Sequence, residues 1–360
     1  MSLASWRGTR FGVAWGEVTG AVGDTVTVLP IVVAVAALTD LSLGRLLLGF
    51  ALFQVVWGLY YGYPISVEPM KALAALVIAG GLSGGEYVAA GLLAGVTLLL
   101  VGTTGTLDRL APYVGEPVVR GIQVGVALVL LRTGVTTGLG APRLAALSVV
   151  VALAAVALGY RNAAALAVLA MGGVVAAGAA GTVTPRLPTP VLLDPSTLVV
   201  SRNAVGATLG QLAMTVGNAA VATALLVDEY FDADTSPDDL STSMGVMNLL
   251  AMPLGAMPMC HGSGGVAGKY AFGARTATSN LVLGGCYLLL AVVAVDLVAA
   301  FPMAVLGVVL VLVAVELGRA GADTEDPLLT GAIGVLALLT NVGVAFLAGL
   351  VGYHALARLR

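Results

Sequence analysis

Apolar segments follow one another along almost the whole chain, and this pattern limits the possible folds more than any other feature. Only 10% of the 360 residues are charged, whereas 59% are hydrophobic. A soluble domain carries about 25% charged residues, because it must cover its surface with polar groups. A protein that faces lipid covers its surface with apolar side chains instead. The sequence therefore predicts an all-α protein that crosses a membrane many times.

Glycine, proline and charged residues separate the apolar segments. The predicted segments are residues 13–38, 46–61, 65–79, 88–101, 118–131, 144–158 and 163–180, followed by 204–227, 244–257, 262–272, 281–295, 298–315, 328–339 and 342–356. They make about fourteen transmembrane segments, although several are shorter than the roughly 20 residues that a perpendicular helix needs. A proline-rich connector over residues 182–203 lies between the two sets of seven.

The two sets of seven indicate an internal repeat, with residues 1–181 as the first copy, residues 204–360 as the second, and no soluble domain. The motif Val-Gly-Asp ending at Asp24 has a counterpart in Val-Gly-Asn ending at Asn218, 194 residues later (218 − 24 = 194). The same offset relates Pro64 to Pro258 (258 − 64 = 194). Because seven is odd, the two copies should have opposite orientations, as in the inverted repeats of many transporters.

Lysine and arginine residues between the segments predict the orientation of the chain. With the N-terminus inside, the cytoplasmic side receives Arg7, Arg10, Arg109, Arg120, Arg161, Lys269, Arg275, Arg319, Arg358 and Arg360, and the opposite side receives Arg45, Arg132, Arg143, Arg186 and Arg202. We therefore expect a multi-pass protein of the plasma membrane with a cytoplasmic N-terminus. The first residues lack the features of a cleaved signal peptide. The acidic stretch over residues 228–239 is predicted to be a solvated loop.

Charge and cysteine content argue against several other classes of protein. The formal net charge of −3 offers no basic patch for nucleic acid. Cys260 and Cys286 lie far apart and form no metal-ligand pattern, so we predict no metal and no cofactor. The catalytic motifs H-E-x-x-H and G-x-S-x-G do not occur in the sequence. An intramembrane enzyme that uses His261 and Glu68 is therefore a remote alternative.

Glu17, Asp24, Glu68 and Lys71 lie inside predicted membrane segments. A charge at the centre of a membrane helix costs roughly 2.5 to 3.5 kcal/mol, so these side chains should face a cavity or each other. We expect Asp24 and Lys71 to form an ion pair. Ionisable residues at this depth are also candidates for function.

The stretch Pro64-Ile-Ser-Val-Glu-Pro-Met-Lys71 cannot form one regular helix, because each proline removes a backbone N–H and clashes with the preceding turn. Glu68 precedes a proline and should be extended, and Pro69 suits the first turn of a new helix. The stretch therefore predicts an extended segment followed by a half-helix that begins inside the membrane.

The second half contains a similar break, Pro258-Met-Cys-His-Gly-Ser-Gly-Gly265, after which a helix should begin near Ser263. Two half-helices that meet at the midplane would direct their N-terminal N–H groups and positive dipole ends at one point. Such a point is suited to an anion. It favours a closed binding site over a channel.

Three stretches, GAVGDTVTVLPIVVA, YPISVEPMKALAA and MPMCHGSGGVAGKYAFGAR, resemble the signature segments of the molybdate transporter family related to the sulfate permeases. In that family the first helix carries a Gly-Asp pair, the third a proline-containing run that ends in Pro-Met-Lys, and the tenth a Cys-His-Gly run before Phe-Gly-Ala-Arg. The resemblance extends in order over nearly the whole chain.

The resemblance implies the fold of the uracil and sulfate permeases, with seven plus seven inverted helices in a core and a gate domain. Substrate would lie between half-helices 3 and 10. Carried over by position, the binding residues are Asp24, Thr25, Ser66, Val67, Glu68, Met70, Lys71, Asn218, His261, Gly262, Ser263 and Gly264. The molybdate branch lacks the C-terminal regulatory domain of the sulfate permeases, and we expect the same here.

The family often has glutamine at the position of Glu68, and this departure bears on the substrate. A carboxylate there would repel an oxyanion unless it is protonated or paired with Lys71. Glu68, His261 and Asp24 are therefore candidates for a coupling proton. The expected function is secondary transport of molybdate, with sulfate or tungstate close behind, and a bicarbonate or nucleobase transporter of the same fold as the alternative. The expected partners are a small inorganic anion and the lipid bilayer, and a homodimer stays open.

Overall fold

The structure, a computed structural model, describes residues 11–181, 184–189 and 192–359. The first half forms α1 (Trp15–Leu38), α2 (Leu43–Tyr61), β1 (Glu68–Pro69), α3 (Lys71–Ile78), α4 (Gly84–Thr103), α5 (Leu107–Val114), α6 (Glu116–Gly138), α7 (Pro142–Ala157), the 3-10 turn η1 (Arg161–Ala163) and α8 (Ala164–Ala180). Arg7, Arg10 and Arg360, used to predict orientation, lie outside the described residues.

The second half begins after the connector, which contains the 3-10 turn η2 (Pro195–Thr197). Its elements are α9 (Arg202–Met214), the π-helical η3 (Thr215–Val221), α10 (Ala222–Phe231), α11 (Pro237–Ala251), η4 (Met252–Leu254), β2 (Met259–Cys260), α12 (Ser263–Ala271), α13 (Thr278–Val293), α14 (Val295–Ala299), α15 (Met303–Ala322), α16 (Pro327–Leu339) and α17 (Val342–Leu359). The protein is therefore a helical bundle, as the sequence predicts.

Capping residues explain where several helices begin. Ser83 accepts a hydrogen bond from the backbone of Glu86, whose carboxylate bonds back to Ser83, and this capping box starts α4. Ser236 and Asp239 start α11 in the same way. Proline in the first turn of α6, α7, α11 and α16 suits a position where the N–H has no partner within the helix.

Within the described residues, eight helices are long and apolar enough to cross a membrane. They are α1, α2, α4, α6, α8 extended by η1, the continuous α9–η3–α10, α15 and α17. Three shorter apolar helices, α7, α13 and α16, contain 10 to 17 residues each. The multi-pass architecture follows from these helices, whereas the expected count of fourteen spans does not follow from length alone.

Two local predictions from the sequence are wrong. The acidic stretch over residues 228–239 is mostly helical, since α10 continues to Phe231 and α11 starts at Pro237. Asp238 and Asp239 stabilise the first turn of α11, where acidic side chains face the positive end of the helix dipole. Lys269, assigned to a cytoplasmic loop, is instead fully buried in α12.

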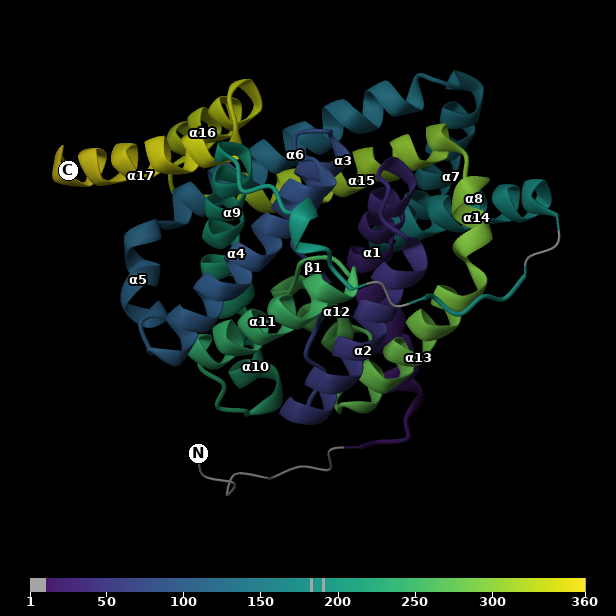
Figure 1. The fold of residues 1–360 in the computed structure, drawn as a ribbon, viewed down its shortest axis with the longest axis horizontal. Helices are drawn as coiled ribbons and strands as arrows, with labels where there is room; N and C mark the ends of the chain where they lie inside the picture. Colours follow the sequence, from purple (N-terminus) through teal and green to yellow (C-terminus); the bar gives the residue numbers. More distant parts are fainter. Residues whose placement is uncertain (1–10, 182–183, 190–191, 360) are drawn as a thin grey trace.

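The helices pack in two groups (Figure 1). In one group α6 lies along α15 and α16, and these helices run across the upper part of the view with α7 and α17. In the other group α2 packs along α13, α4 along α11, and α1 along α12, mostly in the lower part of the view. We call these two groups the gate and the core, respectively.

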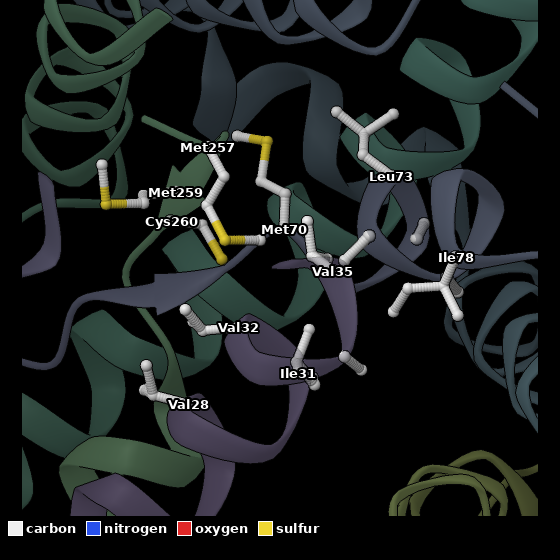
Figure 2. Packing of buried hydrophobic residues seen from close by; sticks show 14 of the residues in the cluster. Val28, Ile31, Val32, Val35, Met70, Leu73, Ile78, Met257, Met259 and Cys260 are labelled. Carbon is white, nitrogen blue, oxygen red and sulfur yellow. The ribbon is translucent and has the colours of Figure 1, made fainter. Parts of the chain in front are cut away.

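Apolar side chains from both halves of the chain pack behind the point where the half-helices meet. Figure 2 shows side chains of α1, Met70 and Leu73 beside the sulfur-containing side chains around β2, namely Met257, Met259 and Cys260. All of them are buried. This packing holds the broken segments at the centre of the core.

Candidate functional site

Two very short strands bring the two broken segments together. β1 and β2 pair antiparallel, with Glu68 opposite Cys260 and Pro69 opposite Met259. The backbone N–H of Met70 continues this pairing by donating to the carbonyl oxygen of Pro258 at 2.9 Å. On the other edge of β2, the side chain of Asn248 donates to Met259 O at 2.7 Å and accepts from Met259 N at 2.8 Å. Backbone groups that proline removes from helical pairing therefore find partners inside the bundle.

The half-helices begin where the strands end. α12 starts at Ser263, as predicted, and α3 starts at Lys71, two residues after Pro69. Pro69 itself lies in β1 rather than in the first helical turn. The first residues of both half-helices therefore lie next to the strand pair.

The carboxylate of Glu68 crosses from the first broken segment to the start of α12. Its Oε1 accepts a hydrogen bond of 2.7 Å from the backbone N–H of Gly265, the third residue of that helix. A Cβ atom at Gly265 would overlap Ser66 Oγ and Asp24 Oδ1, and one at Gly262 would overlap the Glu68 carboxylate. These two glycines are therefore required by the close approach of Glu68 and its neighbours to the α12 backbone.

Lys71 is the first residue of α3, a position where the helix dipole disfavours a cation. Its Nζ lies 2.6 Å from Glu68 Oε2, and this ion pair offsets the unfavourable position. The Glu68 side chain is 1% exposed, whereas that of Lys71 is 23% exposed. The ammonium group is therefore the accessible member of the pair.

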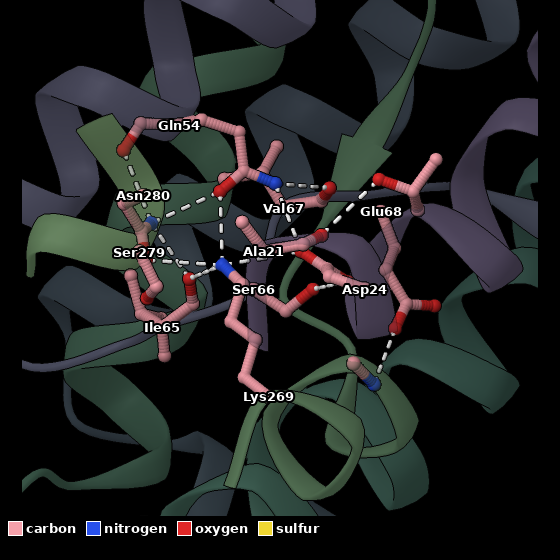
Figure 3. A network of polar contacts seen from close by, with 12 residues as sticks. Ala21, Asp24, Gln54, Ile65, Ser66, Val67, Glu68, Lys269, Ser279 and Asn280 are labelled. Carbon is pink, nitrogen blue, oxygen red and sulfur yellow. Dashed lines mark hydrogen bonds and ion pairs between the residues drawn. The ribbon is translucent and has the colours of Figure 1, made fainter. Parts of the chain in front are cut away.

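The expected ion pair between Asp24 and Lys71 is wrong. Asp24 pairs with Lys269 instead (Figure 3). Asp24 Oδ2 lies 3.1 Å from Lys269 Nζ, and both side chains are fully buried. Asp24 Oδ1 accepts a 2.6 Å hydrogen bond from Ser66, and Oδ2 accepts one of 3.1 Å from Gln54. Lys71 is the partner of Glu68, three residues before it in the chain. The cation that compensates Asp24 is therefore Lys269, which comes from α12.

Lys269, Gln54 and Asn280 complete this buried network, and the sequence analysis missed all three. Lys269 Nζ bonds to Gln54 Oε1, to the carbonyl oxygen of Ile65 and to Asn280 Oδ1 at 2.7 to 3.1 Å. A signal was available, because Lys269 lies inside the predicted segment 262–272 and an uncompensated buried charge is costly.

His261 is fully buried, with a protein partner on each ring nitrogen. Nδ1 lies 2.9 Å from the carbonyl oxygen of Ser66, which only accepts, so Nδ1 carries the proton. Nε2 lies 2.8 Å from Ser243 Oγ. The ring also packs edge-on against Trp57 and Tyr61. These contacts place His261 behind β2 rather than on the accessible side of the site.

Gln211 caps the start of α3. Its Oε1 accepts from the backbone N–H groups of Ala72 at 2.9 Å and Leu73 at 3.4 Å. The N-terminus of α3 is therefore closed by a neutral amide, whereas that of α12 meets the Glu68 carboxylate. The expected symmetric pair of free helix ends is not present in this arrangement.

The accessible side of the site is formed by α12 and η3. Ser263 Oγ donates a 2.7 Å hydrogen bond to Asn218 Oδ1, and Asn218 lies in the π-helical segment. Ser263 and Asn218 are half-buried, and Gly264 is exposed with open space around it. Short π-helical segments occur frequently at functional sites. Of the expected residues, Lys71, Ser263, Gly264, Asn218 and Thr25 are thus the ones with an accessible surface.

The other expected residues support the backbone around the site. Val67 and Met70 are fully buried, and the carbonyl oxygen of Val67 accepts from Gln54 at 3.1 Å. Thr25 is half-buried and donates to the carbonyl oxygen of Ala21. Glu17 accepts three backbone hydrogen bonds from residues 275, 276 and 279 and so caps the start of α13. Among the described residues, no group of three or more His, Cys, Asp or Glu could hold a metal ion.

The chain is similar to curated molybdate transporters over most of its length. A family model described as "Molybdate transporter of MFS superfamily" matches residues 16–130 and 203–317. Molybdate transporter 2 of Arabidopsis thaliana is 30% identical over 372 residues, covering 86% of this chain and 79% of the relative. Molybdate transporter 1 of the same plant is 29% identical over 397 residues, covering 92% and 86%, respectively.

Solved structures of anion transporters have the same fold. The transmembrane domain of the cyanobacterial bicarbonate transporter BicA matches with a TM-score of 0.68 at 17% identity, covering 93% of this chain and 98% of that domain. The murine Solute Carrier 26 family member A9 anion transporter, in its inward-facing state, matches with a TM-score of 0.73 at 14% identity, covering 97% and 69%. At these identities the likeness establishes the fold.

Proposed function

Because the chain belongs to the molybdate transporter family, we propose that it is a secondary transporter of a tetrahedral inorganic oxyanion, with molybdate as the first candidate. Sulfate and tungstate have similar shape and charge and are the next candidates. The names of the relatives support molybdate, and the likeness to anion transporters supports the class of substrate.

One observation carries the proposal, namely the arrangement at the start of α12. The backbone N–H groups of Ser263 and Gly264 have no acceptor in the described part of the chain, and Lys71, whose side chain is 23% exposed, belongs to the same site. Free N-terminal N–H groups together with a cation bind oxyanions through charge-assisted hydrogen bonds. In this proposal Ser263 Oγ and Asn218 supply further polar contacts to the anion.

The charges of the site support coupling to protons. Asp24 with Lys269 and Glu68 with Lys71 are two neutral pairs, so a dianion that enters adds two uncompensated negative charges. Protonation of Glu68 would remove one negative charge and release Lys71 to the anion. By linkage, protonation and anion binding then favour each other. Proton–anion symport through Glu68 is therefore part of the proposal.

A bicarbonate transporter is the second candidate, because Glu68 places a carboxylate where a dianion would be repelled and bicarbonate carries only one charge. The likeness to BicA concerns the fold and leaves the substrate open. A nucleobase is the other alternative of the same fold.

Location, topology and assembly complete the proposal. The protein would lie in the plasma membrane with its N-terminus in the cytoplasm. Removing Lys269 from the count still leaves more arginines on the cytoplasmic side. The inverted repeat of residues 1–181 and 204–360 is supported by the antiparallel pairing of the two broken segments. A homodimer is the expected assembly.

Uptake by purified protein in liposomes tests the substrate. Radiolabelled molybdate, sulfate, bicarbonate and uracil are compared with and without an inward proton gradient, and unlabelled tungstate is added as a competitor. We expect molybdate uptake that the gradient stimulates and tungstate inhibits. Bicarbonate or uracil uptake without molybdate uptake would reject the proposed substrate, and Lys71→Met serves as the inactive control.

A further inference from the structure

A cavity of about 430 Å³ lies between the core and the gate, close to the proposed site. Its walls come from α5, the start of α6, the π-helical η3 and α17. Five side chains with polar groups line it, namely Glu116, Arg120, Gln123, Asn218 and Tyr353. A second cavity of about 340 Å³, between α1, α2, α8 and α13, is lined by apolar residues and glycine only and cannot compensate an anion.

Arg120 is held rigidly at the wall of the polar cavity. Its Nε donates to Glu116 Oε1 at 2.8 Å, and its Nη1 donates to Gln123 Oε1 at 3.3 Å and to the carbonyl oxygen of Ala320 at 3.0 Å. Nη2 has no partner among the described residues, so two N–H donors of the guanidinium group stay free. The side chain is 29% exposed.

The carboxylate of Glu116 accepts hydrogen bonds from Arg120 and from two further donors. Its Oε2 accepts from Thr324 Oγ1 at 3.0 Å and from the backbone N–H of Glu325 at 3.3 Å. These bonds hold Glu116 toward the loop between α15 and α16. The Nη2 group of Arg120 remains without a partner among the described residues. No other ionisable carboxylate lines the cavity among the described residues.

Asn218 connects this cavity with the start of α12. It lines the cavity and also accepts the 2.7 Å hydrogen bond from Ser263. The adjoining Gly217 lies against Val119 of α6, so the cavity ends where core and gate touch. An anion that leaves the start of α12 past Asn218 would therefore enter the space in front of Arg120.

We propose that this cavity is an anion vestibule in which Arg120 concentrates the transported oxyanion before it reaches α12. The proposal rests on the proposed transport function and adds a second, outer station to it. Arg120 acts here through charge and two free N–H donors, while Gln123 fixes the position of the guanidinium group. Glu116 also lines the cavity and balances the charge of Arg120, so the two free N–H donors of Nη2 hold the anion through charge-assisted hydrogen bonds.

Charged thiol reagents test the vestibule without reference to any substrate. In a Cys286→Ser background, Val216→Cys places a thiol on the cavity wall, and Cys260 stays buried. The reaction rates of anionic and cationic methanethiosulfonates are compared in detergent-solubilised protein. We expect Arg120→Gln to lower the anionic-to-cationic rate ratio roughly tenfold, and Arg120→Lys to retain most of it.

Arg319→Gln is the matched control, because Arg319 is exposed and paired with Glu316 outside this cavity. The control should leave the rate ratio unchanged. An unchanged ratio in a folded Arg120→Gln protein would overturn the vestibule and leave Arg120 as a structural partner of Glu116. The same reaction rates are also measured in the presence of molybdate, which should protect the thiol if it occupies the cavity. A lowered rate ratio in Arg120→Gln without such protection would support the vestibule and count against molybdate as its occupant.

Discussion

Glu68 occupies the place at the start of α12 where a transported anion would bind. Its carboxylate bonds to the N–H of Gly265 and to the ammonium of Lys71 at the same time. The proposed anion would use Lys71 and the N–H groups of Ser263 and Gly264, which directly precede Gly265. In the proposed mechanism, Glu68 and the substrate would compete for Lys71 and the positive end of α12, and the protonation of Glu68 would decide the outcome.

Glu68→Gln should remove the pH dependence of substrate binding. In the parent protein, affinity should rise as the pH falls, because protonation neutralises the carboxylate and frees Lys71. Glutamine mimics the protonated form, so the variant should bind molybdate with an affinity nearly constant from about pH 5 to 8. Equilibrium binding of radiolabelled molybdate measures this. A variant whose affinity still rises toward low pH as steeply as the parent would transfer the role to His261 or Asp24.

The two lysines of the site should differ in their effects on stability. Lys269→Met leaves Asp24 buried without its cation, and removing one member of a buried pair lowers the free energy of unfolding by about 3–5 kcal/mol. Lys71→Met should destabilise less, because Lys71 is partly exposed, but should abolish molybdate binding. Thermal unfolding in detergent and binding assays separate the two effects.

The double variant Asp24→Asn with Lys269→Met is the control for the buried pair. It removes both charges and should recover part of the stability that Lys269→Met loses. Equal melting temperatures for the Lys269→Met and Lys71→Met proteins would contradict the assignment of Lys269 to Asp24.

The short helices α3 and α12 depend on glycines and caps rather than on their own length. Helices of eight and nine residues are marginal alone, so tertiary contacts must hold them. Gln211 supplies one such contact at α3, and Glu68 supplies one at α12. The first turn of α12 therefore tolerates side chains only where no neighbour approaches.

Gly265→Ala and Gly264→Ala test this requirement within one motif. A Cβ atom at Gly265 would meet Ser66, Asp24 and Glu68, whereas one at Gly264 would meet nothing within 4 Å. Overpacking of this kind costs about 1–3 kcal/mol. We expect Gly265→Ala to lower the melting temperature clearly and Gly264→Ala to leave it close to that of the parent. The reverse order would show that α12 does not lie against Glu68 in this way.

At the scale of the whole molecule, the proposed transport would require the core and the gate to move relative to each other. The segment η3 packs against α11 of the core, and its Gly217 lies against Val119 of α6 in the gate, so the two groups touch there. A Cβ atom at Gly217 would lie 3.7 Å from the Cβ atom of Val119, within the usual range for a disulfide. This contact offers a way to lock the two groups together.

A disulfide between Gly217→Cys and Val119→Cys, in the Cys286→Ser background, should stop transport. Uptake of molybdate should fall when the pair is oxidised and recover with reductant, while each single variant stays insensitive to both treatments. Gel mobility after limited proteolysis in the connector measures the cross-link. Unchanged uptake by fully cross-linked protein would show that this contact does not separate during the cycle.

The amino-acid sequence by itself determined the membrane class, most helix positions and the two broken segments. These features are local, because apolar length and the loss of N–H groups at proline act within a few residues of the chain. Pro64, Pro69 and Pro258 therefore predicted the half-helices, and the start of α12 at Ser263 is confirmed. The resemblance to the molybdate transporter family is also confirmed by the family match.

Only the tertiary structure decided which charges pair and which groups remain accessible. Asp24 and Lys269 are far apart in the chain, and the local sequence around Lys269, inside the predicted segment 262–272, does not identify its partner. The cap that Gln211 places on α3 and the two partners of His261 likewise depend on distant helices. Pairing energies depend on separation and burial in space, and both arise only when the two halves of the chain pack together.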